Sequence, residues 1–139
     1  MDALLTKILM TLGSVASIGF GIWHFFVPRI WNWYSYIDRS APELVLAVRA
    51  INVFFSLSLV LFGLMNLLMV YGQNANRYSV LIVLCATCAL WAARVVMQLV
   101  YPQGSMNPAL QYGMLLAFIL VLGCYSASLV MVLQDKRPS

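Results

Sequence analysis

The chain has 139 residues, of which 63% are hydrophobic and only 9% charged, and its formal net charge is +4 at pH 7. Soluble domains carry about 25% charged residues, so this composition excludes an ordinary soluble globular protein and predicts an integral membrane protein. A positive charge this small gives no reason to expect nucleic-acid binding.

The first long apolar run covers about residues 4–27. A helix needs roughly 20 apolar residues to cross a bilayer, so this run is long enough. Its apolar part is too long for a cleaved signal peptide and no small-x-small cleavage site follows it, so we expect a retained transmembrane helix. Small residues that permit close helix packing recur at helical spacing in this run and in the last one: Gly13, Ser17, Gly21, Gly113 and Ala117.

An aromatic segment, PRIWNWYSYIDRSAPE, connects the first run to the second. Trp and Tyr favour the boundary between water and lipid, and this segment has four of them: Trp31, Trp33, Tyr34 and Tyr36. We expect the segment to lie flat on the membrane surface as a short interfacial helix. Two interpretations are open, a simple aromatic anchor or a lid over a cavity between the helices.

Three more apolar runs follow, at about residues 44–71, 78–101 and 109–133. They are continuously apolar, whereas the strands of a membrane barrel alternate apolar and polar residues. The links GQNANR and PQGSMNP are short, so successive helices should lie side by side in opposite directions. The sequence therefore predicts an all-α integral membrane protein, an antiparallel four-helix transmembrane bundle with residues 1–139 in one domain.

Basic residues predict the orientation, because cytoplasmic loops carry an excess of Lys and Arg. Four spans place both termini on one side, and that side has four basic residues: Lys7, Arg77, Lys136 and Arg137. The opposite side has two, Arg29 and Arg39. The excess predicts cytoplasmic termini, and we expect the membrane to be a bacterial inner or plasma membrane.

Polar residues within the spans gather in the outer half of the membrane. At a rise of 1.5 Å per residue, Arg49 and Asn52 lie roughly 8–13 Å below the outer start of their span, and Arg94 lies about 10 Å below the outer end of its own. An Arg left in lipid costs roughly 2.5–3.5 kcal/mol on insertion scales, so we expect these faces to point inward. Depth and helical spacing predict one polar pocket, open toward the outer surface and formed by His24, Arg49, Asn52, Trp91, Arg94 and Gln98.

The charge of this pocket indicates its ligand, because no Asp or Glu occurs inside any span. Asp38 and Glu43, in and beside the first link, are available to neutralise Arg49 and Arg94, which would make the polar layer a structural network. Otherwise at least one guanidinium is left for a ligand, and its fork suits a carboxylate, phosphate or carbonyl group. We expect the pocket to bind a lipid-soluble anionic or carbonyl-bearing molecule, either a membrane lipid or a quinone-like cofactor.

His24 gives an alternative, a membrane enzyme that acts on a lipidic substrate with His24 as general acid or base. No other catalytic candidate accompanies it, so the sequence favours a protein that is not an enzyme. A lone His without a second His or a buried acid does not predict a metal site. Further alternatives are an accessory subunit of a larger membrane complex, a homo-oligomer, and a purely structural or assembly factor.

Two other patterns suggest functions that the rest of the chain does not support. Cys85 and Cys88 form a C-x-x-C pair, which is typical of disulfide exchange, but both lie inside the third span. A thiolate is disfavoured there, so we expect these thiols to pack in an apolar environment. Small drug–proton antiporters have a similar size, but proton-coupled cation export needs an intramembrane carboxylate.

The stretch SIGFGIWHFFVPRIW carries a G-x-x-H-x-x-x-P motif, formed by Gly21, His24 and Pro28. In this motif, in size and in number of spans, the chain resembles small four-span bacterial membrane proteins of the DoxX-like group. The resemblance implies an accessory membrane subunit or a protein linked to quinone or sulfur redox metabolism. Of the predicted site residues, it carries over only His24.

Overall fold

The computed structural model describes four stretches of the chain: residues 3–38, 40–73, 75–104 and 106–135. Within them the secondary structure is entirely helical: α1 (Ala3–Ile30), η1 (Trp33–Tyr36), α2 (Pro42–Tyr71), α3 (Arg77–Val100) and α4 (Pro108–Gln134). Each of the four α-helices is long and apolar enough to cross a membrane. The predicted all-α class is confirmed, and the four helices indicate an integral membrane protein.

Asparagines and prolines set several helix ends. Asn76 caps α3, because its side-chain oxygen accepts a hydrogen bond from the N–H of Ser79 at 2.8 Å. Asn107 caps α4 in the same way, and Pro42 begins α2 at a position where a missing N–H costs nothing. After α1, Asn32 adopts a left-handed conformation with φ of 48°, which Asn tolerates better than most residues. This turn leads the chain into η1.

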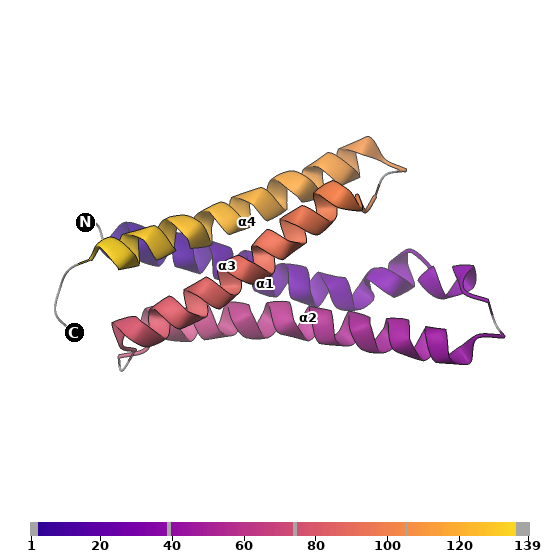
Figure 1. The fold of residues 1–139 in the computed structure, drawn as a ribbon, viewed down its shortest axis with the longest axis horizontal. Helices are drawn as coiled ribbons and strands as arrows, with labels where there is room; N and C mark the ends of the chain where they lie inside the picture. Colours follow the sequence, from indigo (N-terminus) through magenta and orange to yellow (C-terminus); the bar gives the residue numbers. More distant parts are fainter. Residues whose placement is uncertain (1–2, 39, 74, 105, 136–139) are drawn as a thin grey trace.

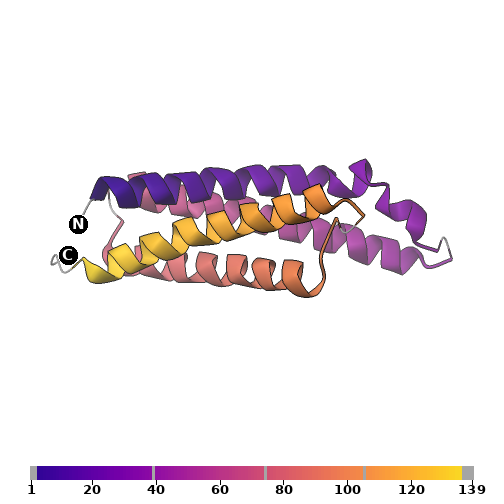
Figure 2. The same ribbon diagram turned by 90° about the horizontal axis from the view of Figure 1, so that it is seen from above.

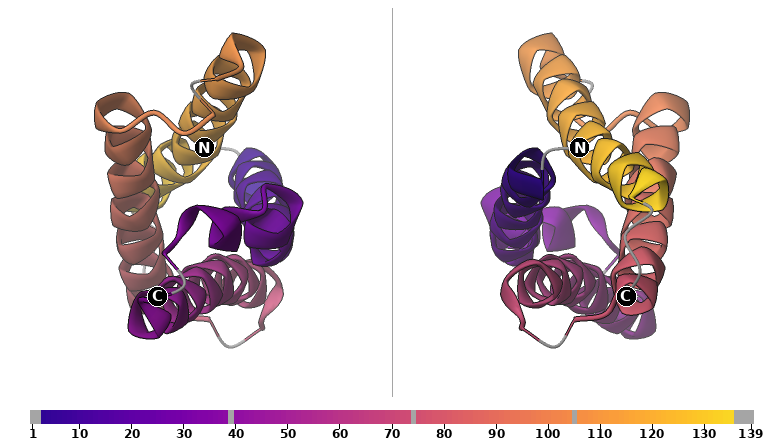
Figure 3. Two further views of the ribbon diagram at one scale, coloured as in Figure 1. Left: turned by 90° about the vertical axis from the view of Figure 1, so that its right-hand side faces the viewer. Right: turned by 90° about the vertical axis from the view of Figure 1, so that its left-hand side faces the viewer.

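The four helices form two hairpins, α1–α2 and α3–α4 (Figure 1). The start of α1, the end of α4 and the α2–α3 turn lie at one end of the molecule, which we call the closed end. The segment η1 and the α3–α4 connection lie at the other end, which we call the open end (Figures 1 and 2). The hairpins lie together at the closed end and diverge toward the open end (Figures 1 and 3). The orientation predicted above partly depends on Arg39, Lys136 and Arg137, which lie outside the described residues.

Glycines bring α1 and α2 into close contact along what we call the α1–α2 seam. A Cβ added to Gly21 would lie 2.7 Å from the carbonyl oxygen of Ser56, and one added to Gly63 would lie 2.8 Å from that of Ser14. The packing role predicted for Gly21 is therefore confirmed. Gly113 of α4 differs, because a Cβ there would meet no atom within 4 Å. The prediction that Gly113 serves close helix packing is wrong, since no neighbouring helix approaches it.

Buried hydroxyl groups join the two hairpins. The indole Nε1 of Trp91 on α3 donates to the Ser17 Oγ of α1 at 3.0 Å, and the Tyr125 hydroxyl of α4 lies 3.0 Å from the same oxygen. Nearer the closed end, Asn66 Nδ2 of α2 donates to Thr87 Oγ1 of α3 at 2.7 Å. All five side chains are buried. These bonds fix the arrangement of the helices below the point where the hairpins diverge.

Candidate functional site

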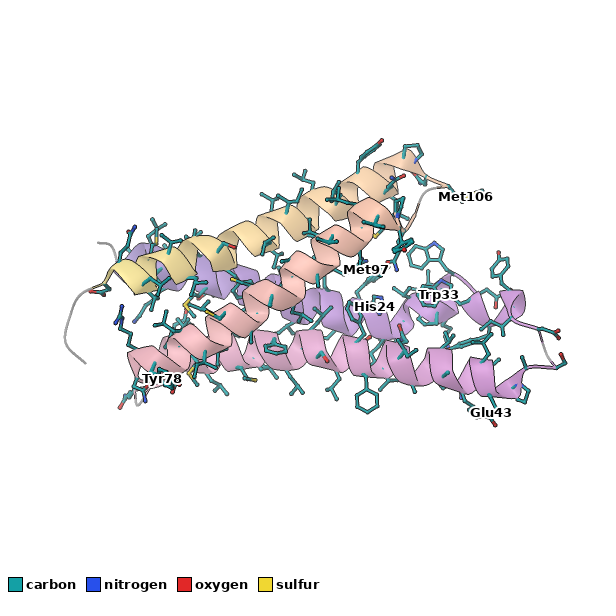
Figure 4. The ribbon with its side chains drawn as sticks, viewed as in Figure 1. His24, Trp33, Glu43, Tyr78, Met97 and Met106 are labelled. Carbon is teal, nitrogen blue, oxygen red and sulfur yellow. The ribbon has the colours of Figure 1, made fainter. Side chains whose placement is uncertain are left out.

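A cavity of about 710 Å³ lies between the hairpins. This volume is typical of sites that bind one small ligand. All four tryptophans of the chain line it: Trp23, Trp31, Trp33 and Trp91. Apolar residues form most of the remaining wall, and the polar side chains on it are His24, Arg94, Gln103 and Asn107. Figure 4 shows His24 and Trp33 near the place where the hairpins diverge.

The floor of the cavity is a cluster of three aromatic rings. Phe20 of α1 packs edge to face against Phe118 of α4, with ring centroids 5.3 Å apart. Trp91 of α3 lies 5.8 Å from each of these rings. Trp91 is held by its hydrogen bond to Ser17, so the floor has a fixed geometry. Aromatic pairs at these distances add to the stability gained from burial alone.

Arg94 is the only cation on the described part of the cavity wall. Its guanidinium carbon lies 4.3 Å from the centre of the Phe118 ring, a cation–π contact. One of its terminal nitrogens donates to the Gln103 Oε1 at 2.7 Å. A guanidinium has five N–H donors, and Gln103 is the only hydrogen-bond partner of Arg94 among the described residues. Arg94 therefore has donors left for a ligand.

The acidic residues considered as partners for the arginines do not reach them. Within the described stretches, neither Asp38 nor Glu43 forms an ion pair with Arg49 or Arg94. Asp38 instead accepts a hydrogen bond from the backbone N–H of Ser40 at 2.9 Å, in the loop before α2. This bond lowers the pKa of the Asp38 carboxyl. The described structure therefore gives no support to a charge-balanced network around Arg94.

A hydrogen-bond chain fixes the proton position of neutral His24. Its Nδ1 lies 3.3 Å from Ser56 Oγ. Ser56 uses its only hydroxyl hydrogen in a 2.7 Å bond to the backbone carbonyl of Asn52, so His24 Nδ1 must be the donor. A neutral His24 then keeps Nε2 as an acceptor. Asn52 is another polar neighbour of His24, and its buried Oδ1 lies outside hydrogen-bonding geometry with every described group.

The structure brings three of the six predicted site residues to the cavity wall, His24, Trp91 and Arg94. Asn52 supports this group, because its carbonyl orients Ser56 beneath His24. Arg49 does not point inward as expected. It is exposed, and its guanidinium carbon lies 5.5 Å from the Tyr34 ring of η1. Arg49 lies close enough to the start of α2 for its long side chain to extend toward the surface.

Gln98 is buried but does not line the cavity. Its Nε2 donates to the backbone carbonyl of Gln103 at 2.9 Å, and the N–H of Gln103 points back at Gln98 Oε1 at 3.4 Å. Gln98 therefore holds the α3–α4 connection in the position from which Gln103 contacts Arg94. It is a positioning residue rather than a residue of the wall.

Sequence reasoning missed Gln103, Trp23 and Phe118. The short link after α3 is the signal for Gln103, because a short link returns toward the helix that it follows. Trp23 and Phe118 carry no such signal, since aromatic residues are ordinary in a membrane span. Their role depends on which helix faces reach the cavity.

Comparison of the chain with protein-family models, curated proteins and solved structures gives no match. Within the described stretches, no His, Cys, Asp and Glu residues cluster in a way that could hold a metal ion. Cys85 and Cys88 are free thiols; Cys88 packs against the core, whereas Cys85 is exposed. The polar groups on the cavity wall, His24, Arg94, Gln103 and Asn107, can form hydrogen bonds, and Arg94 can pair with a negative charge.

Proposed function

We propose that this protein binds a lipid-soluble amphiphile in the cavity between its hairpins, with an anionic or carbonyl group of the ligand at Arg94. The observation that carries the proposal is the environment of Arg94. The side chain lies on the wall of a mostly apolar cavity, and its one hydrogen-bond partner among the described residues is the neutral amide of Gln103. A ligand oxygen would supply the partner that the described side chains do not.

The energetics favour a ligand with a negative or strongly polar head group. Hydrogen bonds from a guanidinium to a carboxylate are roughly twice as strong as neutral ones and often form in pairs. They are stronger still in an apolar surrounding, where water does not screen them. The cavity supplies that surrounding through its tryptophans and through the aromatic floor of Phe20, Trp91 and Phe118. A lipid and a quinone-like molecule both meet these requirements.

The proposal includes a membrane setting. An antiparallel transmembrane bundle with cytoplasmic termini would place the open end, and with it the cavity, in the outer half of the bilayer. In the sequence, four basic residues belong to the side of the termini (Lys7, Arg77, Lys136 and Arg137) and three to the other side (Arg29, Arg39 and Arg49), so the positive-inside rule supports this orientation. The resemblance to DoxX-like proteins of bacterial membranes keeps a quinone-like molecule among the candidate ligands, beside a lipid.

Native mass spectrometry tests the proposal on protein extracted gently from its own membrane. We expect a small stoichiometric adduct on the parent protein, and its loss in Arg94→Gln. Removing a charge-assisted hydrogen bond costs about 1.5–3 kcal/mol, which corresponds to roughly a 10- to 150-fold loss of affinity. Arg49→Gln is the matched control, because Arg49 is exposed and lies off the cavity wall.

Two outcomes would contradict the proposal. One is an adduct that survives in Arg94→Gln, and the other is a parent protein without an adduct. If such an adduct-free parent retained a partner protein instead, an accessory or structural subunit would become the better explanation. Thermal unfolding of both variants checks that loss of the adduct is not loss of the fold.

His24 supports a second candidate function, a membrane enzyme. In its neutral form, its Nε2 is an acceptor on the same wall as Arg94, so it has the form required of a general base, with Arg94 available to stabilise negative charge as it develops. His24→Gln separates the two functions. If the protein is an enzyme, the mass of the adduct changes over time in the parent, and His24→Gln retains the adduct but abolishes that change. If the protein only binds the ligand, the mass of the adduct stays constant in both the parent and His24→Gln.

A further inference from the structure

The cavity is enclosed unevenly, and its exposed lining residues indicate where it opens. On the side of α2 and α3, the lining residues Leu59 and Trp91 are 3% and 1% exposed. On the side of α1 and α4, the lining residue Trp23 is 50% exposed, and Ala109 and Gly113 are exposed as well. The wall therefore has an opening between α1 and α4, next to the rim at the open end, where Gln103 and Met106 are also exposed.

The path of the helices explains this opening. Along what we call the α1–α4 seam, Gly13 packs on the ring of Tyr125 and Phe20 packs on Phe118. Beyond Phe118, α4 moves away from α1 toward the open end (Figures 1 and 3). In this part α4 lines the cavity with small residues at intervals of four, Ala109, Gly113 and Ala117, and with the larger Leu110 and Met114 beside them. The space beside Gly113 is empty, because a Cβ there would meet no atom within 4 Å.

Two segments border the cavity at the open end without closing it, since Met106 is 98% exposed. Trp33 of η1 lines the cavity, as do Gln103, Gly104 and Met106 of the α3–α4 connection. These two segments border the cavity from opposite hairpins, and Gln98 holds the α3–α4 connection in place. The gap between α1 and α4 is the part of the opening that would face lipid in a membrane.

We propose that the ligand is a single-chain amphiphile with a carboxylate head, which enters sideways from the lipid through the α1–α4 seam. Its hydrocarbon chain lies along Ala109, Gly113 and Ala117, and its carboxylate pairs with Arg94. This inference rests on the proposed function and specifies the ligand class. A two-chain phospholipid is larger than the single small ligand that a cavity of about 710 Å³ accommodates. A carboxylate matches the guanidinium fork, which has no acidic partner among the described residues.

The four tryptophans make the inference testable by fluorescence. Trp23, Trp31 and Trp33 are replaced by Phe, which leaves Trp91 on the cavity floor as the only indole. The probe is 9,10-dibromostearate, whose bromines quench an indole that they touch. In lipid nanodiscs we expect saturable quenching of Trp91 by dibromostearate. We expect little quenching by a dibrominated two-chain phosphatidylcholine at the same bromine content, and quenching roughly tenfold weaker in affinity by the dibrominated stearyl alcohol.

Two leucine substitutions on α4 test the path of the chain. Gly113→Leu fills the empty space beside the seam, so it should weaken quenching by dibromostearate at least roughly tenfold. Gly123→Leu is the matched control, because Gly123 also has no atom near its Cβ position but does not line the cavity. We expect Gly123→Leu to leave quenching unchanged. If the tryptophan variant does not fold, the same two substitutions are compared in the parent chain by native mass spectrometry with added dibromostearate.

The outcomes separate this inference from the proposed function. If Arg94→Gln loses the native adduct but dibromostearate does not quench Trp91, the cavity binds a ligand and the single-chain carboxylate is wrong. If the alcohol quenches as well as the acid, the carboxylate at Arg94 is wrong. If Gly113→Leu has no more effect than Gly123→Leu, the sideways path is wrong. If the native adduct survives in Arg94→Gln as it does in Arg49→Gln, the proposed function itself is wrong.

Discussion

Helix α1 makes two seams of opposite character. Along the α1–α2 seam, Gly21 and Gly63 lie so close to the partner backbone that an added methyl group would overlap a carbonyl oxygen. Along the α1–α4 seam, the helices touch at Phe20 and Phe118 and then separate, and Gly113 faces empty space. The first seam holds a hairpin together, and the second forms the side of a cavity.

The difference between the seams shows that a glycine in a membrane span has two uses. It permits two helices to approach closely, or it leaves room for something that is not protein. Small residues at intervals of four predict neither use by themselves, because both depend on what the partner helix places opposite. In this molecule Gly21 has the first use and Gly113 the second, although both lie in long apolar helices.

The largest effect is expected at the α1–α2 seam. In Gly21→Ala, the new Cβ would lie 2.7 Å from the Ser56 carbonyl oxygen and 2.9 Å from the backbone nitrogen of Val60. Backbone atoms cannot move aside, so the two helices must separate. Overpacking of this kind costs about 1–3 kcal/mol of unfolding free energy. Reversible unfolding in mixed detergent micelles measures it.

The control for that substitution is Gly123→Ala on α4, where the added methyl group meets nothing within 4 Å. Ala is favoured over Gly in a helix by about 0.8–1 kcal/mol, so this variant should be unchanged or slightly more stable. Equal destabilisation in both variants would remove the distinction between the two seams.

A smaller effect is expected at Ser17, where the two hairpins are joined. Ser17→Ala removes the acceptor of the buried Trp91 Nε1–H and one partner of the Tyr125 hydroxyl. A buried donor left unpaired costs about 1–3 kcal/mol, and hydrogen bonds between helices in a bilayer are worth less, up to about 1.7 kcal/mol. We expect a loss of about 1–2 kcal/mol of unfolding free energy.

Ser58→Ala is the comparison for Ser17→Ala, because the Ser58 hydroxyl bonds only to Phe54 of its own helix among the described residues. Its replacement should leave the unfolding free energy nearly unchanged. The emission of Trp91 should also shift in Ser17→Ala and not in Ser58→Ala. If the two variants behaved alike, the network would not hold the hairpins together.

The helices themselves could be predicted from the sequence because hydropathy and end signals are local. The expected run of about residues 44–71 becomes Pro42–Tyr71, and that of about 109–133 becomes Pro108–Gln134. The aromatic link contains a short helix, Trp33–Tyr36, as expected. It lies at the open end, where Trp33 lines the cavity, and both the anchor and the lid interpretation stay open.

The site could be predicted only in part, because depth along a helix is easier to infer than direction around it. His24 and Arg94 share a depth and do meet at one cavity. Arg49 has a similar depth, but its side chain extends to the surface at Tyr34. Gln98 is buried as expected, yet it contacts the α3–α4 connection rather than the cavity. Such differences depend on tertiary contacts that helical spacing does not specify.

The smallest effect is expected at Gln98, which holds the α3–α4 connection without lining the cavity. Gln98→Leu removes the 2.9 Å bond to the Gln103 carbonyl and the longer, 3.5 Å bond to the Gln111 carbonyl, but Gln103 is exposed and water replaces the shorter bond. The unfolding free energy should therefore fall by less than about 1 kcal/mol. Hydrogen exchange should become faster in the α3–α4 connection and stay unchanged in the α1–α2 seam. Ligand affinity should fall a few-fold because Gln103 no longer holds Arg94.

The control is Met97→Leu at the exposed neighbouring position, which should change neither hydrogen exchange nor ligand affinity. Faster hydrogen exchange throughout the bundle would instead show that Gln98 stabilises the core and not only the α3–α4 connection.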